Sequence, residues 1–395
     1  MTRAFLVVMD SVGIGAAPDA ANYSSGGVAD TAANTLGHIA QAQDGGLHLP
    51  NLDALGLGAA LRQASGQTAP GLAARPGGLW GVAVPQAAGK DTPSGHLDLA
   101  GAPVDKPLHV FPQKTPAFPD ELVARVQKEA GTDGILGNCH ASGTEILDRL
   151  GAEHMRTGWP ICYTSTDSVF QIAAHEERFG LDRLMETCAR LAPVLHGMGV
   201  GRVIARPFVG TAQTGFTRTG NRRDFAMPPP SRTLCDWVHA SGRRVHALGK
   251  IGDIFSMRGI DTLAKGSDAA LMAHLSRAVQ EAEDGSLTFV NFVEFDSLYG
   301  HRRDAAGYAQ ALEWFDAAIG PVLAALRGGD IMVITADHGN DPTAPGTDHT
   351  RECVPVLIAG LGPGKLGWMD FVDVAACVAA HLGVPNEGPG RNRLP

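Results

Sequence analysis

Three stretches of the chain share one pattern, a short run of apolar and mostly β-branched or aromatic residues that ends at an aspartate. They are AFLVVMD (4–10), LTFVNFVEFD (287–296) and DIMVITAD (330–337). Continuous apolar runs of this length are typical of parallel strands that are buried on both faces. Ligands of such sheets bind beyond the carboxyl ends of the strands. The pattern therefore predicts that Asp10, Asp296 and Asp337 meet at one edge of a sheet.

Apolar residues recur at helical spacing in three other segments, which are 268–283, 308–326 and 371–383. The last segment ends on Gly383, which is a typical helix stop. The alternation of buried strands with such helices predicts an α/β fold, in which a mainly parallel central sheet is flanked by helices.

The middle of the chain has a different pattern. Dense proline and glycine, a possible strand in WPICYTST (159–166) and the run PPP (228–230) indicate a second domain with a boundary linker. A chain of 395 residues also exceeds the usual size of one hydrophobic core. We therefore expect an inserted α/β domain over 106–228, and a discontinuous core made of 1–105 and 229–395.

Composition excludes some classes of protein. The formal net charge of −9 argues against binding to nucleic acid or to a membrane surface. The six cysteines form no CxxC pair, which favours buried thiols in a reducing compartment over a disulfide framework. The N-terminal run FLVVM is too short for a signal peptide or a membrane span. We expect a cytoplasmic protein and a monomer.

The stretch ITADHGNDPTAPGTDHTRE (334–352) gathers acids and histidines directly after an apolar run. A solvated acidic loop, or side chains that cap turns, would each explain it in part. Together with the residues at the other strand ends, however, a set of six carboxylates and imidazoles would converge: Asp10, Asp296, His301, Asp337, His338 and His349. Without cations these groups would repel one another and lose solvation. Asp and His ligands without thiolates favour Mn²⁺ or Zn²⁺ over Ca²⁺, and two ions could share them.

The segment KDTPSGHLDLAG (90–101) resembles the start of a helix, with Thr92 as N-cap and Pro93 as the first helical residue. A capped helix is the simplest interpretation. The functional alternative is that the hydroxyl lies where free backbone amides and the helix dipole attract a phosphate, and acts as a nucleophile. Ser94 is the rival nucleophile in the same loop.

The sign of the charge reverses between residues 202 and 250, a segment that contains nine basic and two acidic residues in an otherwise acidic chain. A solvated basic surface would be an ordinary explanation. The arginines of IARPF and TRTGNRRD suit bidentate binding of a phosphate at a distance from the metal ligands.

Further motifs include MDSVGIGAAPDA, ASGTEILDRLGAEHM, YTSTDSVFQIAAHEE, GKIGDIF and FDSLYGHRRD. Together with the segments above, and in the same order along most of the chain, they closely resemble the phosphopentomutase family of the alkaline phosphatase superfamily. The resemblance implies an alkaline-phosphatase-like core with an inserted cap domain. It also implies an isomerase of nucleoside catabolism that interconverts ribose or 2-deoxyribose 1-phosphate with the 5-phosphate, with a sugar bisphosphate as intermediate and activator.

The resemblance also assigns residues. It implies two Mn²⁺ ions, one bound by Asp10, Asp337 and His338 and the other by Asp296, His301 and His349. Thr92 matches the phosphorylated threonine of the family. The positions that match its pentose phosphate site are Ser165, Asp167, Arg206, Arg222 (or its neighbour Arg223) and Lys250.

Two segments, GHLDLAG and VFPQKTPAFPDEL, depart from the family pattern, which puts the shape of the pocket in question but changes no metal ligand. Other classes remain to be weighed. A phosphoglycerate mutase would use a serine nucleophile and a different insert, and a phosphatase or sulfatase would need no basic cap. A catalytically silent binding protein would have an incomplete ligand set, whereas this set is complete.

Overall fold

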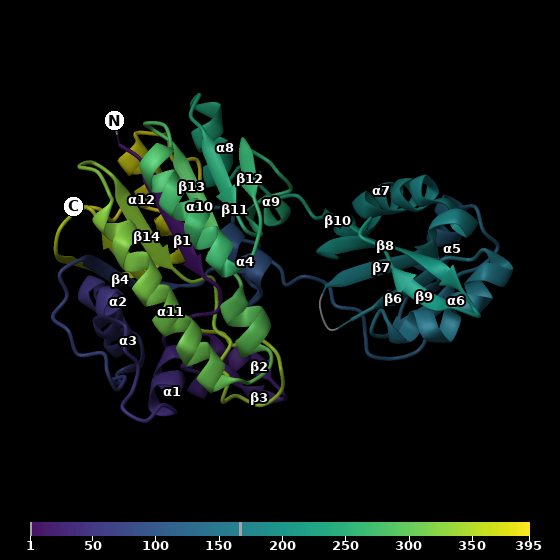
Figure 1. The fold of residues 1–395 in the computed structure, drawn as a ribbon, viewed down its shortest axis with the longest axis horizontal. Coiled ribbons are helices and arrows are strands. Elements are labelled where there is room, and N and C mark those ends of the chain that lie inside the picture. Colours follow the sequence, from purple (N-terminus) through teal and green to yellow (C-terminus); the bar gives the residue numbers. More distant parts are fainter. Residues whose placement is uncertain (1, 166–167) are drawn as a thin grey trace. The chain divides into compact units, whose positions relative to one another are not determined.

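The computed structural model describes residues 2–165 and 168–395. The chain divides into two compact units (Figure 1). The core unit contains the residues up to Lys106 together with Pro229–Pro395, and the inserted unit is Pro107–Pro228.

An eight-stranded sheet forms the centre of the core unit, in the order β12-β11-β13-β1-β14-β15-β4-β16. Neighbouring strands are parallel, except that β15 is antiparallel to both of its neighbours, which confirms the predicted mainly parallel sheet. The strands are β1 (Ala4–Met9), β4 (Leu79–Val84), β11 (Val245–Leu248), β12 (Thr262–Ala264), β13 (Leu287–Phe292), β14 (Ile331–Thr335), β15 (Val354–Ala359) and β16 (Gly364–Asp370).

The three apolar runs form the middle of this sheet. Strand β1 lies between β13 and β14, with Met9 opposite Phe292 and Val8 opposite Thr335. All residues of these three strands are buried, as the continuous apolar pattern predicts. Their carboxyl ends therefore reach the same edge of the sheet.

The predicted strand 287–296 is too long. Strand β13 ends at Phe292, and Asp296 lies in a following helical turn, η4 (Phe295–Gly300). The ladder stops because the backbone N–H groups of Val293 and Glu294 each donate to the carboxylate of Asp268, at 3.1 Å.

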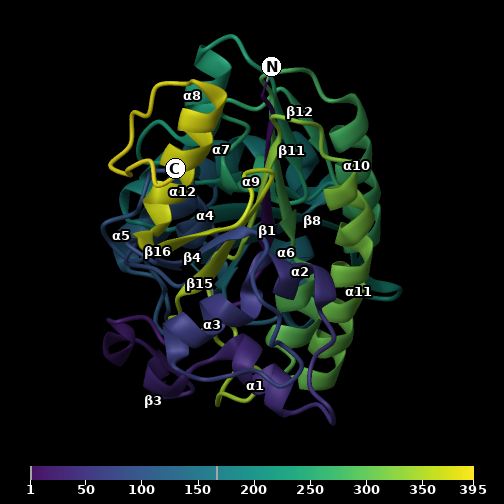
Figure 2. The ribbon, with the colours of Figure 1, turned by 90° about the vertical axis from the view of Figure 1, so that its left-hand side faces the viewer.

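Helices cover both faces of the core sheet, as Figure 2 shows with α10 and α11 on one side and α12 and α8 on the other. The three predicted helices are confirmed as α10, α11 and α12, and α12 ends at Gly383, which has a φ of +66°. The helices are α1 (Thr35–Gln41), α2 (Pro50–Leu55), α3 (Leu57–Ser65), α4 (Thr92–Leu99), α8 (Leu234–Ala240), α9 (Ile251–Ile254), α10 (Asp268–Glu281), α11 (Ala305–Ala324) and α12 (Phe371–Leu382). The small elements are η1 (Ala20–Asn22), η2 (Asp30–Ala32) and the hairpin of β2 (Ser24–Ser25) and β3 (Val28–Ala29).

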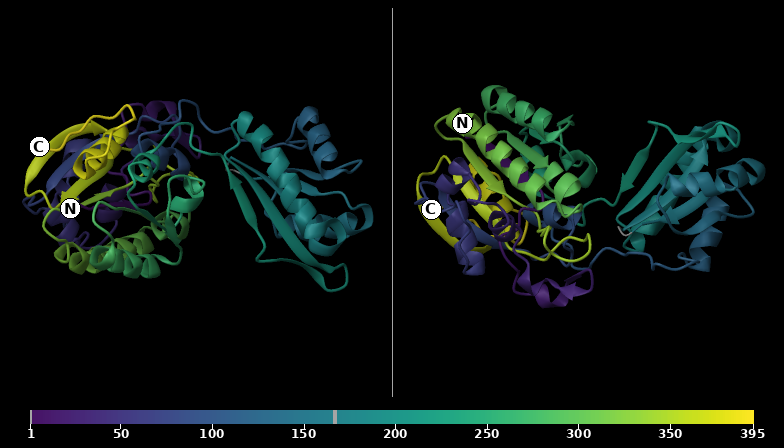
Figure 3. Two further views of the ribbon diagram at one scale, coloured as in Figure 1. Left: turned by 90° about the horizontal axis from the view of Figure 1, so that it is seen from above. Right: turned by 60° about the horizontal axis from the view of Figure 1, so that its bottom comes forward.

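The inserted unit has its own mixed sheet, in the order β10-β8-β7-β6-β5, with β9 paired to β8 (Figure 3). Helices α5 and α7 pack on one face and α6 packs on the other, each over a separate apolar cluster. The strands are β5 (Leu136–His140), β6 (Ile161–Thr164), β7 (Val169–His175), β8 (Arg202–Thr211), β9 (Gly215–Arg218) and β10 (Arg223–Ala226). The helices are α5 (Asp120–Ala130), α6 (Glu145–Thr157), η3 (Glu176–Gly180) and α7 (Leu181–Gly197).

Among the described residues, no helix combines the length and apolar character needed to cross a membrane.

Candidate active site

Buried carboxylates and imidazoles meet at the carboxyl edge of the core sheet. Two groups of three side chains each have ligand atoms that lie within 4.8 Å of one another. The groups are Asp10, Asp337 and His338, and Asp296, His338 and His349. His338 belongs to both groups, so its imidazole is the centre of the cluster.

The geometry of His338 leaves one nitrogen available. Its Nδ1 lies 3.0 Å from the carbonyl oxygen of Gly339, to which it can donate, so the lone pair of Nε2 becomes available to a cation once the imidazole is neutral. Nε2 lies 3.4 Å from Asp10 Oδ1 and 3.4 Å from Asp337 Oδ2. Burial alone would lower the pKa of His338, but the carboxylates of Asp337 and Asp10 outweigh it and raise the pKa to about 10.

Asp296 lies between two further histidines. His349 Nε2 is 3.4 Å from Asp296 Oδ1, and His301 Nε2 is 3.1 Å from Asp296 Oδ2. His301 Nδ1 lies 2.6 Å from the carbonyl oxygen of Thr347, so its Nε2 is also available as a ligand. The structure thus brings all six residues of the sequence-derived ligand set together at this edge.

The cluster has the chemistry of a site for divalent cations. Among the described residues, Asp10 Oδ1 and His349 Nε2 are buried without a hydrogen-bond partner, whereas Asp337 Oδ2 lies 3.0 Å from the imidazole nitrogen of His96. Burial and then the neighbouring Asp337 carboxylate raise the pKa of Asp10. Unpartnered buried carboxylates are costly unless a cation compensates them. Oxygen and imidazole donors without thiolates fit ions such as Mn²⁺ or Zn²⁺.

Thr92 is the first residue of α4 and is 8% exposed. Its hydroxyl oxygen lies 3.3 Å from His338 Nε2. The prediction that Thr92 is the N-cap is wrong, because Asp91 has that position and its carboxylate accepts from the backbone N–H of Ser94 at 3.0 Å. The Thr92 hydroxyl is therefore not needed to cap the helix.

The expectation of free backbone amides at this helix start fails for the three residues after Thr92. Pro93 has no N–H group, the N–H of Ser94 donates to the Asp91 carboxylate, and that of Gly95 donates to the Asp91 carbonyl at 3.0 Å. The hydroxyl of Ser94, the rival nucleophile, donates to Asp91 Oδ2 at 2.8 Å. Of the amides of this turn, only that of Thr92 itself has no acceptor among the described residues, so most of the charge on a phosphate beside Thr92 must be compensated by other groups.

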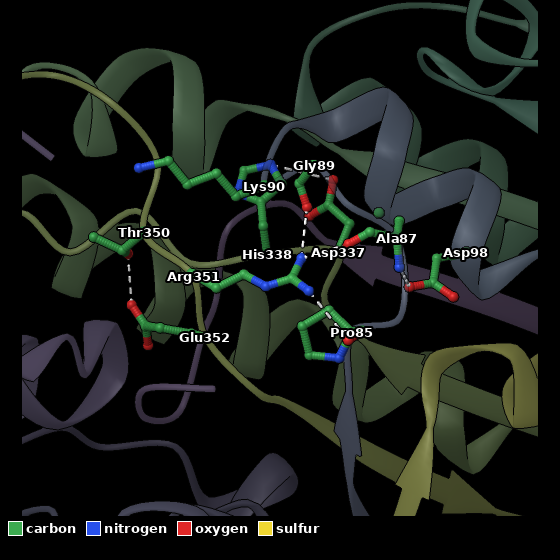
Figure 4. A pocket seen from close by; sticks show the side chains of 11 residues that line it. Pro85, Ala87, Gly89, Lys90, Asp98, Asp337, His338, Thr350, Arg351 and Glu352 are labelled. Atoms are coloured by element: carbon green, nitrogen blue, oxygen red, sulfur yellow. Dashed lines mark hydrogen bonds and ion pairs between the residues drawn. The ribbon is translucent and has the colours of Figure 1, made fainter. Parts of the chain in front are cut away.

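The segment before Thr92 is held from both sides by two residues that the sequence analysis did not single out (Figure 4). The buried guanidinium of Arg351 donates to three carbonyl oxygens of this segment, those of Pro85, Ala87 and Gly89, at 3.2, 2.8 and 2.6 Å. The carboxylate of Asp98 accepts from the amides of Gln86 and Ala87, at 2.6 and 2.7 Å. Arg351 follows His349 by two residues, so its place beside the acid-rich stretch was the available signal.

Lys250 is exposed and directly precedes α9 in the core unit. Ser165 directly follows β6 of the inserted unit and is half-buried, whereas Asp167 lies outside the described residues.

Three arginines of the inserted unit, Arg206, Arg218 and Arg222, form a cationic group. Arg206 Nε donates to Gln171 at 3.0 Å, and burial followed by the charges of Arg222 and Arg218 lowers the pKa of Arg206. Arg222 forms a bidentate pair with Asp224, with both distances 2.7 Å, whereas Arg223 lies over the ring of Phe225.

Tyr163 lies beside the same group and was also missed by the sequence analysis. It is 1% exposed, and its hydroxyl has no hydrogen-bond partner in the part of the chain that the structure describes. Burial raises the pKa of Tyr163, and the charges of Arg206, Arg218 and Arg222 oppose this shift.

Comparison with known proteins identifies the class. The sequence matches the metalloenzyme superfamily over residues 2–385, and the chain belongs to that superfamily. The phosphopentomutase of Methylobacterium nodulans is 55% identical over 404 residues, which cover 98% of each chain. The phosphopentomutase of Rhizobium leguminosarum bv. trifolii is 51% identical over the full length of both. The chain therefore belongs to the phosphopentomutase family, which confirms the resemblance found in its motifs.

Among solved structures, a phosphoglycerate mutase of Leishmania mexicana aligns over 98% of this chain and 97% of its own, with 14% identity and a TM-score of 0.47.

Proposed function

We propose that this protein is a phosphopentomutase that interconverts α-D-ribose 1-phosphate, or its 2-deoxy form, with the 5-phosphate. The observation that carries the proposal is the contact between Thr92 and His338, with the threonine hydroxyl 3.3 Å from the imidazole that both ligand groups share. A nucleophile at that position would lie beside the one candidate ligand that belongs to both groups.

The proposal includes two divalent ions, Mn²⁺ in our hypothesis. Asp10, Asp337 and His338 would hold one ion, and Asp296, His301 and His349 the other. When bound, such ions would neutralise the charge of a phosphoryl group and favour the alkoxide form of a neighbouring hydroxyl.

Thr92 carries the transferred phosphoryl group in this proposal. The free hydroxyl of the sugar phosphate attacks the phosphorus, the bond from phosphorus to Thr92 Oγ1 breaks, and a sugar bisphosphate forms. The bisphosphate then returns its other phosphate to Thr92, which leaves the isomeric monophosphate. Positioning and compensation of charge supply most of the catalysis in such transfers.

The substrate's own phosphate needs cationic partners. We propose that Arg206 and Arg222 bind it in the inserted unit, with Ser165 and Asp167 as further contacts, and that Lys250 contributes from the core unit. The charges of Arg222 and Arg218 lower the pKa of Arg206, so the three guanidinium groups lie near one another, which supports a phosphate-binding role for this group. Arg222 is favoured over Arg223, because Arg223 stacks on Phe225.

The first test is an assay that follows free phosphate and ribose 5-phosphate separately, starting from ribose 1-phosphate with Mn²⁺. Wild type should form ribose 5-phosphate with little free phosphate, and Thr92→Ala should abolish the conversion. Ser94→Ala is the matched control, because it also removes a hydroxyl from this helical turn. The Ser94 hydroxyl donates to the cap residue Asp91.

The same assay distinguishes the alternatives. Free phosphate as the main product would make the protein a hydrolase. Conversion that survives in Thr92→Ala but is lost in Ser94→Ala would move the nucleophile to Ser94. Running the assay on 2-deoxyribose 1-phosphate as well gives the preference between the two sugars.

A further inference from the structure

Each of the three buried carboxylates at the site has one oxygen held by an amide of the protein. The pairs are Asn291 Nδ2 with Asp10 Oδ2 at 2.9 Å, Asn340 Nδ2 with Asp296 Oδ1 at 2.7 Å, and the backbone N–H of Ser11 with Asp337 Oδ1 at 3.0 Å. Both asparagines are completely buried. An amide that donates a hydrogen bond to one oxygen of a buried carboxylate leaves mainly the other oxygen available as a metal ligand.

The other oxygen of each carboxylate points at the imidazoles. Asp10 Oδ1 has no hydrogen-bond partner among the described residues. Asp10 Oδ1 and Asp337 Oδ2 each lie 3.4 Å from His338 Nε2, and Asp337 Oδ2 also lies 3.0 Å from His96 Nδ1. Asp296 Oδ2 lies 3.1 Å from His301 Nε2, although Asp296 Oδ1 is also 3.4 Å from His349 Nε2. The amides thus leave each carboxylate with one oxygen directed into the cluster.

The orientation of the Asn340 amide is fixed from behind. The guanidinium of Arg303 donates to Asn340 Oδ1, so the NH₂ group must face Asp296. Arg303 is itself anchored on the carbonyl oxygens of Gly346 and Asp348, at 2.7 and 2.9 Å. Gly300 leaves room for this arrangement, because a β-carbon there would come within 2.8 Å of Asn340 Nδ2.

Asn291 is held differently. It is a polar residue in the middle of the apolar strand β13, and its Oδ1 is buried without a hydrogen-bond partner among the described residues. Among the described residues, the side chain of Asn291 makes one hydrogen bond, which its Nδ2 donates to Asp10. A buried polar group with half its capacity unused is costly, so packing alone does not account for an asparagine at this position.

We propose that Asn291 and Asn340 are positioning residues for two different metal ions. Asn291 holds Asp10 so that Asp10 ligates through Oδ1, and Asn340 holds Asp296 so that Asp296 does not use both oxygens on one ion. Each asparagine therefore supports the ion bound by its own aspartate. This inference rests on the two-ion site of the proposed function. Loss of such supporting hydrogen bonds typically weakens metal binding by about 10–100-fold.

The test measures metal binding rather than turnover. Protein freed of metal is titrated with Mn²⁺, and anomalous scattering from crystals at a limiting Mn²⁺ concentration gives the occupancy of each position. Asn291→Ala should lower the affinity of the position next to Asp10 by about 10–100-fold and leave the other within about 3-fold, and Asn340→Ala should do the reverse. The matched control is Asn51→Ala, because Asn51 Nδ2 donates to buried Asp316 at 3.0 Å, outside the site.

The outcomes separate this inference from the proposed function. Wild type that binds no Mn²⁺ at these ligands would overturn the two-ion site itself. Two results would overturn only the roles of the asparagines, provided that the wild type binds two ions. In the first, both alanine variants bind Mn²⁺ as tightly as the wild type. In the second, each variant loses the same affinity at both metal positions. If an alanine variant does not fold, the variants Asn291→Leu and Asn340→Leu keep the volume but cannot donate. Binding that is unchanged or tighter in these variants would also overturn the proposal.

Discussion

Gly95 packs directly against the backbone of Asp337. A β-carbon at position 95 would come within 2.8 Å of the carbonyl carbon of Asp337 and 2.9 Å of its β-carbon. His96, the next residue, strengthens the connection, because its Nδ1 lies 2.9 Å from the carbonyl oxygen of Thr92 and 3.0 Å from Asp337 Oδ2. The helix that carries Thr92 is thus joined to the strand end that carries a candidate metal ligand.

Substitution of Gly95 by alanine should therefore disable the site. The obstacle is backbone, which cannot rotate away, so α4 must shift and Thr92 must move with it. Overpacking of this kind costs about 1–3 kcal/mol, and a displacement near 1 Å can lower the rate by about 100-fold. Mutase activity and the thermal unfolding temperature measure the two effects.

Gly328→Ala is the control, because an added β-carbon there has no neighbouring atom within 4 Å. It should retain full activity. Retained activity in Gly95→Ala would show that the contact between α4 and Asp337 is less rigid than the geometry indicates.

Arg351→Met should loosen the segment that precedes Thr92. The substitution keeps much of the side-chain volume but leaves the carbonyl oxygens of Pro85, Ala87 and Gly89 without their donor, and leaves Asp19 without its ion pair. Loss of one partner of a buried ion pair costs about 3–5 kcal/mol of unfolding free energy. The cost is smaller here, because Asp19 is 40% exposed and water can solvate its carboxylate. We expect a loss of about 2–3 kcal/mol in unfolding free energy and a lower kcat with little change in KM.

Denaturant unfolding and steady-state kinetics check this prediction. Arg62→Met is a suitable comparison, since Arg62 is an exposed residue of α3 and should tolerate the change within about 0.5 kcal/mol. A variant with normal kcat and normal stability would show that Asp98 alone holds the segment.

The centre of the fold was predictable because its strands are buried on both faces. Strands β1, β13 and β14 consist of continuous apolar runs, and such runs have few other stable placements. The meeting of Asp10 and Asp337 then follows from parallel pairing. Helix α12 could be assigned together with its end, because Gly383 takes the left-handed conformation that stops it.

The errors lie where side chains decide local structure. Asp91 and Thr92 are adjacent residues that can both cap a helix, and only the geometry shows that the Asp91 carboxylate does so. The end of β13 depends on Asp268, which is distant in sequence. Asn291 and Asn340 act through partners from separate elements, so no local pattern could have identified them. For Arg351 the one local signal was its place beside the acid-rich stretch.

Removal of divalent ions should destabilise the core unit. Without them, Asp10, Asp296 and Asp337 lie buried close together, and Asp10 Oδ1 has no hydrogen-bond partner among the described residues. A chelator should lower the unfolding temperature and Mn²⁺ should restore it, because each ion adds about 2.7 kcal/mol to the unfolding free energy at 100 times its dissociation constant. His349→Ala should respond less, since one ligand is gone. An unfolding temperature that does not change with chelator would argue against resident ions.

The inserted unit should lose stability in mild acid because of His154. This residue is completely buried, its Nδ1–H donates to the carbonyl oxygen of Trp159 at 2.7 Å, and its Nε2 accepts from the backbone N–H of His175 at 3.0 Å. Burial lowers the pKa of His154 to about 4, from 6.5 in an unfolded chain. Between these values the unfolded chain binds a proton that the folded unit does not.

The stability that His154 contributes is therefore complete above pH 6.5 and is lost as the pH falls towards 4. The slope is at most about 1.4 kcal/mol per pH unit, so the loss approaches roughly 3 kcal/mol at pH 4. Hydrogen exchange of peptides that cover β7 and α6, corrected for the intrinsic effect of pH, measures it. His154→Gln should be less stable at pH 7.5 but flatter between pH 6.5 and 5, whereas His109→Gln, at an exposed position, should keep the wild-type slope. An equal slope in His154→Gln would assign the acid sensitivity to another group.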